Sequence, residues 1–182
     1  HLLERFYDPQ DGSVLLHGAD LRAVPKGVLR SGIALITQDV FLFADTIRNN
    51  ILVGNPPVSE TRLEEIVNGC GLRRLIESLP QGLDTVLTEG GRTLSSGERQ
   101  LIAFARALAR DPEVLILDEA TSSVDTQTEH LIQEATVRLM EGRTGVVVAH
   151  RLSTIQNADR ILTLNRGRIR EETAGKSSPR SR

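Results

Sequence analysis

Two adjacent carboxylates follow a run of four apolar residues at 114–117. Asp118 and Glu119 would then stand at the carboxyl end of a buried strand, the edge where open parallel sheets bind ligands. There Asp118 could hold Mg²⁺ through water molecules, and Glu119 could orient or deprotonate an attacking water. The same residues also fit a core strand followed by a helix cap. Taken alone, the hexapeptide leaves both interpretations open.

A second candidate stands at the start of a predicted helix that runs to Arg110, where residues 94–98 read Leu-Ser-Ser-Gly-Glu. Unpaired N–H groups and the helix dipole favour a negative charge at such an N-terminus, which makes it a candidate anion site. Its residues are Ser95, Ser96, Gly97 and Glu98. Ser95 with Glu98 also fits a capping box, which is a purely structural device. The motif therefore predicts a helix start and leaves anion binding as an alternative.

Three further polar residues have positions that suit the same site. Gln38 and His150 each follow a predicted apolar strand, so both would lie at the sheet edge that carries Glu119. There His150 could donate a hydrogen bond to a phosphate, although a lone histidine after a strand is more often structural. Asp125 lies just beyond Glu119 and, by itself, is read more simply as a turn residue or a helix cap.

The pattern of apolar residues predicts an α/β scaffold that would position these groups. Short apolar runs predict strands at 33–37, 114–117, 145–149 and 161–165. Helical spacing predicts a small helical insert within 46–79, a helix ending at Arg110, another over 129–140, and the tail of a helix over the first six residues. Buried strands that alternate with helices indicate a parallel sheet covered by helices.

Composition excludes several classes of protein. Aromatic residues make up 3% of the 182 residues and the net charge is −2, so nothing indicates a nucleic-acid partner. No apolar run approaches the ~18–20 residues of a membrane-spanning helix. The single cysteine, Cys70, cannot form an internal disulfide and suggests a reducing compartment. The polar, basic residues 173–182 are expected to form a disordered tail.

Five motifs, in chain order, together resemble the nucleotide-binding domain of ABC transporters. They are similar to the Q-loop at Gln38, the signature at 94–98, the Walker B strand at 114–118 with the catalytic glutamate Glu119, the D-loop at 122–125 and the switch histidine His150. The resemblance spans residues 2 to about 172. It implies a P-loop NTPase-like fold without its N-terminal part, with an ATPase core at 1–39 and 113–172 and a helical subdomain at 40–112.

The resemblance also implies ATP and Mg²⁺ as cofactors and assigns a role to each motif. Gln38 and Asp118 would help to hold Mg²⁺, Glu119 would activate the water, and His150 would touch the γ-phosphate. Nucleotide contacts would come from Ser95, Ser96, Gly97, Glu98 and Asp125, with the signature completing the site of a second, head-to-tail domain. Such a division suits phosphoryl transfer, which is catalysed by positioning and charge stabilisation.

Further phrases resemble the exporter branch of this family. They are residues 5–9, 41–51 and 149–155, together with Thr-Glu-Gly at 88–90, which is similar to a loop that contacts the membrane domain. The resemblance implies an exporter ATPase at the cytoplasmic face of the cell membrane. Its partners would be a membrane domain, expected upstream on the same polypeptide, and a second nucleotide-binding domain of the same or a different chain.

The sequence departs from the family pattern in its phosphate-binding loop, its signature and its ending. The phosphate-binding loop G-x-x-x-x-G-K-[ST] would lie before Leu2, so this polypeptide alone is expected to bind and hydrolyse ATP poorly. Ser96 and Glu98 replace the usual Gly and Gln, which favours an unlike partner domain. The usual Gly-x-His phrase after Ile169 is absent. Two alternatives stay open: a soluble ABC-type ATPase acting on nucleic acid or ribosomes, and a truncated, non-catalytic domain.

Overall fold

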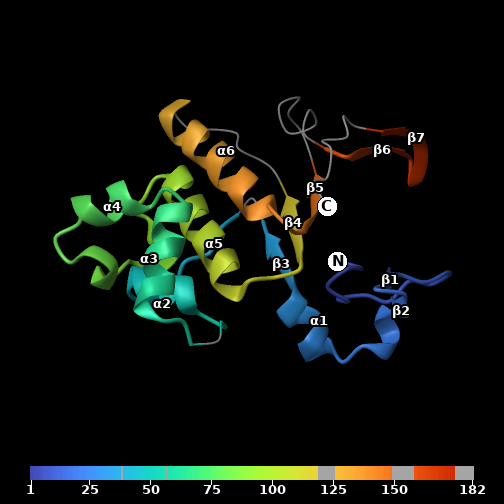
Figure 1. The fold of residues 1–182 in the computed structure, drawn as a ribbon, viewed down its shortest axis with the longest axis horizontal. Coiled ribbons are helices and arrows are strands. Elements are labelled where there is room, and N and C mark those ends of the chain that lie inside the picture. Colours follow the sequence, from blue (N-terminus) through green and yellow to red (C-terminus); the bar gives the residue numbers. More distant parts are fainter. Residues whose placement is uncertain (38, 56, 119–125, 149–157, 175–182) are drawn as a thin grey trace.

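The computed structural model describes residues 1–37, 39–55, 57–118, 126–148 and 158–174. In chain order the strands and helices are β1 (Leu15–Leu16), β2 (Ala19–Asp20), α1 (Lys26–Gly32), β3 (Ile33–Ile36), α2 (Ile47–Leu52), α3 (Glu60–Gly69), α4 (Arg73–Ser78), α5 (Ser96–Arg110), β4 (Val114–Asp118), α6 (Thr126–Met140), β5 (Thr144–Val148), β6 (Arg160–Asn165) and β7 (Arg168–Ala174). Short 3₁₀ turns lie at Leu21–Ala23, Gly82–Asp84 and Glu89–Gly91. Figure 1 shows these elements along the chain.

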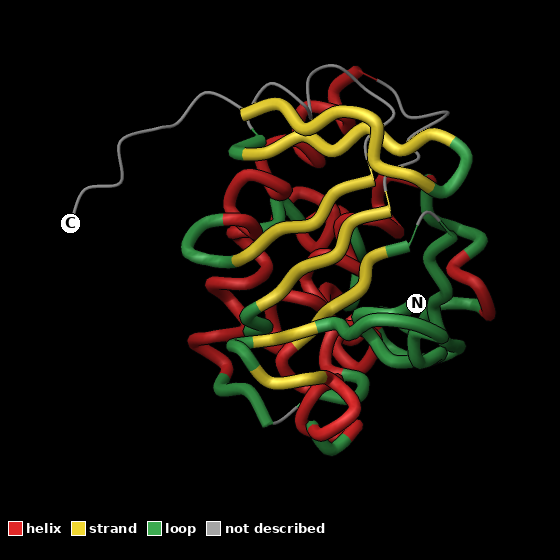
Figure 2. Tube along the Cα trace, turned by 90° about the vertical axis from the view of Figure 1, so that its right-hand side faces the viewer, coloured by secondary structure: helices red, strands yellow, loops and turns green. Residues whose placement is uncertain are grey.

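A three-stranded parallel sheet, in the order β3-β4-β5, forms the centre of the fold (Figures 1 and 2). Ile33 pairs with Val114, and Val114 pairs in turn with Thr144. The parallel pairing and the helices that connect these strands confirm the predicted α/β class. β3 and β4 are largely buried, as expected for apolar strands in a parallel sheet.

The last two strands differ from the sequence prediction. Residues 161–165 were expected to add a strand to the parallel sheet, but β6 pairs antiparallel with β7 in a separate two-stranded sheet. The reason is the turn between them: Arg166 and Gly167 have φ of 49° and 74°, the backbone of a type I′ hairpin turn. β7 also takes in Thr173 and Ala174, so the expected tail begins later than 173, and residues 175–182 lie outside the described part.

β5 is more exposed than its sequence predicts. Its valines Val146 and Val148 are 40% and 49% exposed, whereas Leu115 in β4 is fully buried. Within the described residues β5 pairs with one strand only, β4. The apolar strand β5 therefore lies at the edge of the sheet that the described residues form.

The first six residues form a turn with the hydrogen bonds of a helix C-terminus, in agreement with the predicted helix tail. The Phe6 N–H donates to the His1 carbonyl at 3.0 Å and the Arg5 N–H to that of Leu2 at 3.1 Å. With Arg5 at φ 55°, this is the bonding pattern of a helix C-terminus. The Arg5 guanidinium also donates to the carbonyls of Leu21 and Val24, which fixes this turn against the following 3₁₀ turn.

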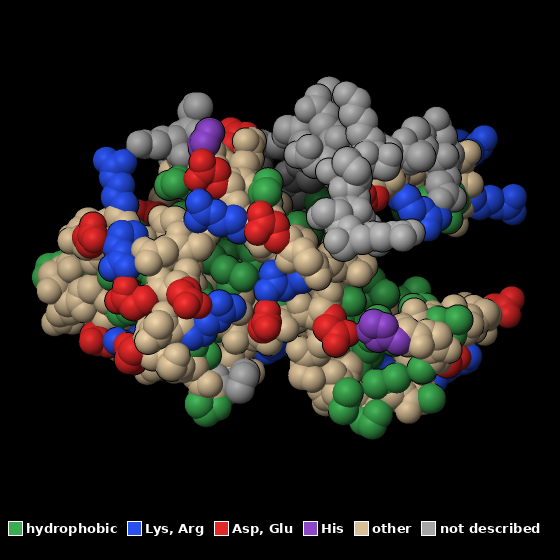
Figure 3. Space-filling view, viewed as in Figure 1, with side chains coloured by type: hydrophobic (Ala, Val, Ile, Leu, Met, Phe, Trp, Pro, Cys, Tyr) green, Lys and Arg blue, Asp and Glu red, His purple; other side chains and the backbone are tan. Residues whose placement is uncertain are grey.

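Helices α2 to α5 form the predicted helical part, which lies to one side of the sheet in Figure 1. α5 turns one apolar face inward, so that Leu101, Phe104 and Ala105 are buried while its arginines stay at the margin. Arg48 on α2 pairs with Glu60 at 2.8 Å and Asp84 at 3.0 Å, which ties α2 to two neighbouring segments. Figure 3 shows acidic and basic groups interspersed on this part of the surface.

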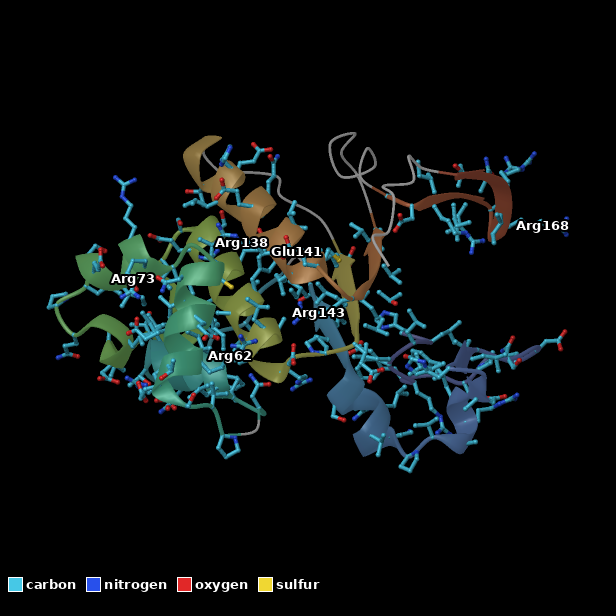
Figure 4. All side chains as sticks on the ribbon, in the orientation of Figure 1. Arg62, Arg73, Arg138, Glu141, Arg143 and Arg168 are labelled. Carbon is cyan, nitrogen blue, oxygen red and sulfur yellow. The ribbon has the colours of Figure 1, made fainter. Side chains whose placement is uncertain are left out.

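Several arginines join elements by donating to backbone carbonyls at element ends. Arg138 on α6 donates to the carbonyls of Asn68 and Gly69 at 3.3 and 3.2 Å, at the C-terminus of α3 (Figure 4). Arg143 donates to the Pro112 carbonyl at 3.1 Å and pairs with Asp111 at 2.6 Å. These contacts tie α6 and the segment after it to the ends of α3 and α5.

Cys70 is fully buried beside the end of α3. Burial raises the pKa of its thiol to about 12, so the thiol stays protonated and acts as a small apolar core group. Among the helices of the described residues, none combines the length and apolarity needed to span a bilayer.

Candidate functional site

The three parallel strands end at one edge of the sheet, as the sequence predicts. Ile36 pairs with Leu117, and Asp118 pairs with Val148, so the chain leaves β3, β4 and β5 at the same level. Asp118 is the last residue of β4 and is exposed there. An exposed carboxylate at a strand end suits Mg²⁺ held through water. Gln38, Glu119 and His150 follow these strand ends but lie outside the described residues, as does Asp125; their roles stay predictions.

The start of α5 has the capping box that its sequence predicts. The Ser95 hydroxyl accepts a hydrogen bond from the Glu98 N–H at 3.2 Å, and a Glu98 carboxylate oxygen accepts one from the Ser95 N–H at 2.7 Å. Ser95 and Ser96 are exposed, whereas Gly97 is buried. The structural alternative is therefore confirmed, and the anion-binding role stays a prediction. The Glu98 carboxylate itself interacts favourably with the positive end of the helix dipole.

Removal of the cap should measurably weaken the fold. We expect Ser95→Ala to lower the free energy of unfolding by about 1 kcal/mol, because the Glu98 N–H loses its partner. Glu98→Gln is the matched control, since the amide oxygen can still accept from the Ser95 N–H. Urea denaturation followed by circular dichroism measures both variants. Equal losses for the two variants would show that the cap is not the cause.

A groove of about 280 Å³ lies beside the predicted Q-loop position. Its lining includes Thr37 and Asp39, the neighbours of Gln38 in the chain. Phe41 and Phe43 contribute exposed rings that meet edge to face, with centroids 5.2 Å apart. The groove thus lies between the strand-end edge of the sheet and the helical part, and it offers an aromatic surface.

Two arginines one turn apart on α5 line the other wall of this groove. Arg106 donates through Nε to the Asn50 carbonyl at 2.9 Å, and Arg110 donates through Nε to the Asn55 side-chain oxygen at 3.2 Å. Burial, and secondarily the charge of Arg110, lower the pKa of Arg106. An arginine keeps its charge under all ordinary conditions, so this wall is positive.

Sequence reasoning did not single out these groove arginines or the buried Asn50. Arg106 and Arg110 are spaced four apart at the margin of an amphipathic helix, and this spacing was the available signal. Asn50 shares a helical stripe with Ile47 and Ile51, and all three are fully buried. A polar residue on an apolar stripe marks a position where the backbone needs a partner.

Comparison with known proteins agrees with this arrangement. Residues 1–122 match the family model described as ABC transporter. The ATP-dependent lipid A-core flippase of Syntrophus aciditrophicus is 51% identical over 174 residues, covering 96% of this chain and 29% of the flippase. A probable multidrug resistance ABC transporter ATP-binding/permease protein of Bacillus subtilis, YheH, is 47% identical over 171 residues, covering 94% of this chain and 25% of that protein.

The fold also matches a solved structure. A bacterial Atm1-family ABC exporter with ATP bound superposes with a TM-score of 0.87 at 41% identity, over 95% of this chain and 30% of the exporter chain. The chain thus spans less than a third of the length of these relatives. Because the family model matches most of the residues, and the parallel sheet ends where the family's motifs stand, the chain belongs to the ABC transporter family.

Proposed function

We propose that the chain is part of the ATP-hydrolysing domain of a membrane exporter, in which ATP hydrolysis drives transport. The observation that carries the proposal is the common edge of β3, β4 and β5, where the sequence places Gln38, Glu119 and His150 around the exposed Asp118. Parallel sheets bind ligands at this edge. The names of the relatives, a flippase, an ATP-binding/permease protein and an exporter, favour this function over that of a soluble ATPase.

In this proposal each residue positions one part of the reaction. Asp118 and Gln38 hold Mg²⁺, which neutralises charge on the phosphates when bound. Glu119 orients and deprotonates the attacking water, and His150 donates a hydrogen bond to the terminal phosphate. Asp125 contacts nucleotide across the dimer. Catalysis then depends on placement and charge, with little covalent chemistry for the protein to supply.

The signature residues act on the nucleotide of a second domain. Ser95, Ser96 and Gly97 present a helix N-terminus that favours a negative charge, and Ser95 and Ser96 are exposed. Glu98 fixes this end of the helix through the capping box. The second domain is a like or an unlike copy, and the replacement of the usual Gly and Gln by Ser96 and Glu98 favours an unlike one.

A membrane domain is the second partner in this proposal, and the chain then lies at the cytoplasmic face of the membrane. The groove beside Gln38 supports this assignment, because it combines exposed Phe41 and Phe43 with two arginines. We propose that a segment of the membrane domain facing the cytoplasm occupies it. The relatives are at least three times as long as the part matched here, and YheH carries both activities in its name. Nucleic acid is not among the proposed partners.

Glutamate replacement in the intact polypeptide tests the proposed function. Glu119→Gln should lower ATP turnover in membranes on the order of 10²–10⁴-fold, because general-base catalysis is lost. Glu141→Gln removes the same charge at an exposed position on the surface near the end of α6 and should leave turnover unchanged (Figure 4). Phosphate release measured in membrane vesicles decides the matter. Undiminished turnover of the Glu119→Gln protein would remove Glu119 from the mechanism.

A further inference from the structure

Two segments far apart in the chain are paired through their backbones next to the signature helix. The Gly90 N–H donates to the Leu42 carbonyl at 2.9 Å, and the Leu87 N–H donates to the Asp45 carbonyl at 2.9 Å. Further along, the Ile47 N–H donates to the Thr85 carbonyl at 3.0 Å, and Thr46 bridges antiparallel to Val86. Residues 42–47 and 85–90 therefore form one connected ribbon, which is called the 42–90 ribbon below.

Leu42 and Gly91 meet at the end of the 42–90 ribbon. Leu42 is fully buried, and a Cβ placed on Gly91 would stand 2.7 Å from Leu42 Cδ1 and 3.5 Å from Leu42 Cβ. Gly91 also has φ 59°, a backbone conformation that side chains disfavour. Because Leu42 is packed on every side, its side chain has little room to move away. Any residue but glycine at 91 would therefore force Leu42 to shift and would hold a strained backbone.

The chain between Gly91 and the signature is held at each end. The Leu94 N–H donates to the Gly91 carbonyl at 3.0 Å, and the Leu94 side chain is 7% exposed. Arg99 on α5 donates to the Leu94 carbonyl at 2.6 Å. Ser95 follows at once as the cap of α5. The Leu42–Gly91 contact is therefore connected to Ser95 through a short turn that is anchored by the buried side chain of Leu94.

The same end of the 42–90 ribbon also reaches the groove. Leu42 lies between Phe41 and Phe43, which line the groove and are both exposed. Asn50 holds the same segment, because its Oδ1 accepts from the Phe43 N–H at 2.8 Å and its Nδ2 donates to the Phe43 carbonyl at 3.1 Å. The wall of the groove and the Leu42–Gly91 contact therefore share one stretch of backbone.

We propose that Leu42 is a positioning residue that sets the place of Ser95 through its contact with Gly91. The proposal rests on the proposed function, because Ser95 matters for ATP turnover only if it completes the site of a second domain. Leu42 acts through Gly91 and Ser95 and touches no reacting group.

Glycine-to-alanine replacement at 91 and 90 tests the contact with a matched pair. Both glycines have positive φ, 59° and 73°, but a Cβ on Gly90 meets nothing within 4 Å. In the intact polypeptide in membranes, Gly91→Ala should lower kcat on the order of tenfold or more, since small misplacements of catalytic groups have large effects on rate. KM for ATP should change little, because the lost interaction is made only after the two nucleotide-binding domains have come together around the nucleotide. Gly90→Ala should stay close to the unmodified protein.

A double replacement separates positioning from general damage. Leu42→Ala removes the same contact from its other side, so it should lower kcat by itself, and the Gly91→Ala, Leu42→Ala protein should lose little more kcat than Gly91→Ala alone. Equal kcat for Gly91→Ala and Gly90→Ala would overturn the proposal. So would a double variant whose loss equals the product of the two single losses, because the two replacements would then act independently.

Nuclear magnetic resonance of the 182-residue chain tests the connection without ATP turnover. Gly91→Ala should shift the amide resonances of residues 95–98, Leu42→Ala should shift them too, and Gly90→Ala should leave them in place. Unshifted resonances in the Gly91→Ala chain would overturn the proposed connection. If the resonances behave as expected while the intact polypeptide shows no ATP turnover, the connection stands and the proposed function fails.

Discussion

Replacement of Asn50 by aspartate should lower the free energy of unfolding at pH 7 by about 3–5 kcal/mol, the cost of a buried charge without a partner. Asn50 is fully buried, and its Nδ2 donates to the carbonyls of Phe43 and Thr46 at 3.1 and 3.0 Å. A carboxylate cannot donate, so Asn50→Asp would set a negative charge against these carbonyl oxygens. The segment that carries Leu42 and Phe43 would lose its anchor on α2.

The pH dependence of this loss follows from the same burial. Burial and the facing carbonyls raise the pKa of the introduced carboxyl in the folded protein above its value in the unfolded chain. Between those two values the folded protein binds more protons, so the loss grows as the pH rises and shrinks as the pH falls. Urea denaturation at pH 7 and at pH 5 measures both effects.

Asn49→Asp is the matched control for this replacement. Asn49 neighbours Asn50 on α2 but is exposed, and its side chain donates to the Asp45 carboxylate at 2.8 Å. The change introduces the same charge in water, where two like charges cost about 0.5 kcal/mol or less. If both aspartate variants lose the same stability, burial of the Asn50 amide is not the reason.

The 182-residue chain on its own should show ATP turnover at least on the order of 10³-fold below that of the intact polypeptide, since several preorganised phosphate contacts are absent together. The sequence contains two lysines, Lys26 and Lys176, and neither stands in G-x-x-x-x-G-K-[ST]. The backbone N–H groups and lysine of that loop grip the β- and γ-phosphates. Asp118 and the residues after the strand ends cannot replace this positive cradle.

Calorimetric titration with ATP and Mg²⁺, together with a phosphate-release assay, checks this expectation on the purified chain. The intact polypeptide provides the reference, and its Glu119→Gln variant gives the background. Turnover by the 182 residues close to the reference would mean that another part of this chain grips the phosphates.

Local patterns predicted the central strands and the signature helix well. Four apolar residues before Asp118 indicated β4, and Ser95 with Glu98 indicated the start of α5, because a strand core and a capping box are both local properties. The partners of a strand, and whether it lies at the edge of a sheet, depend on residues that are distant in the sequence. That is why β5 was expected to be buried and why β6 was assigned to the parallel sheet.

The candidate site divides in the same way. Parallel pairing could be inferred, so the edge that carries Asp118 was predicted correctly, whereas the strand order was not predicted. The groove could not be predicted from the sequence, because it forms where Phe41 and Phe43 approach Arg106, more than 60 positions away in the chain. The burial of Asn50 could have been predicted from its place on an apolar helical stripe. Its role could not, because it depends on the path of the 43–46 backbone, which no local pattern gives.

The open edge of β5 bears on how the chain behaves at high concentration. Residues 144–148 read Thr-Gly-Val-Val-Val, without a charge or a proline, and Val146 and Val148 stand exposed. An uncharged, apolar edge strand is a template for strand pairing between molecules. Copies of this chain separated from the rest of a longer polypeptide would therefore tend to join through β5, so self-association competes with folding whenever that edge is left uncovered.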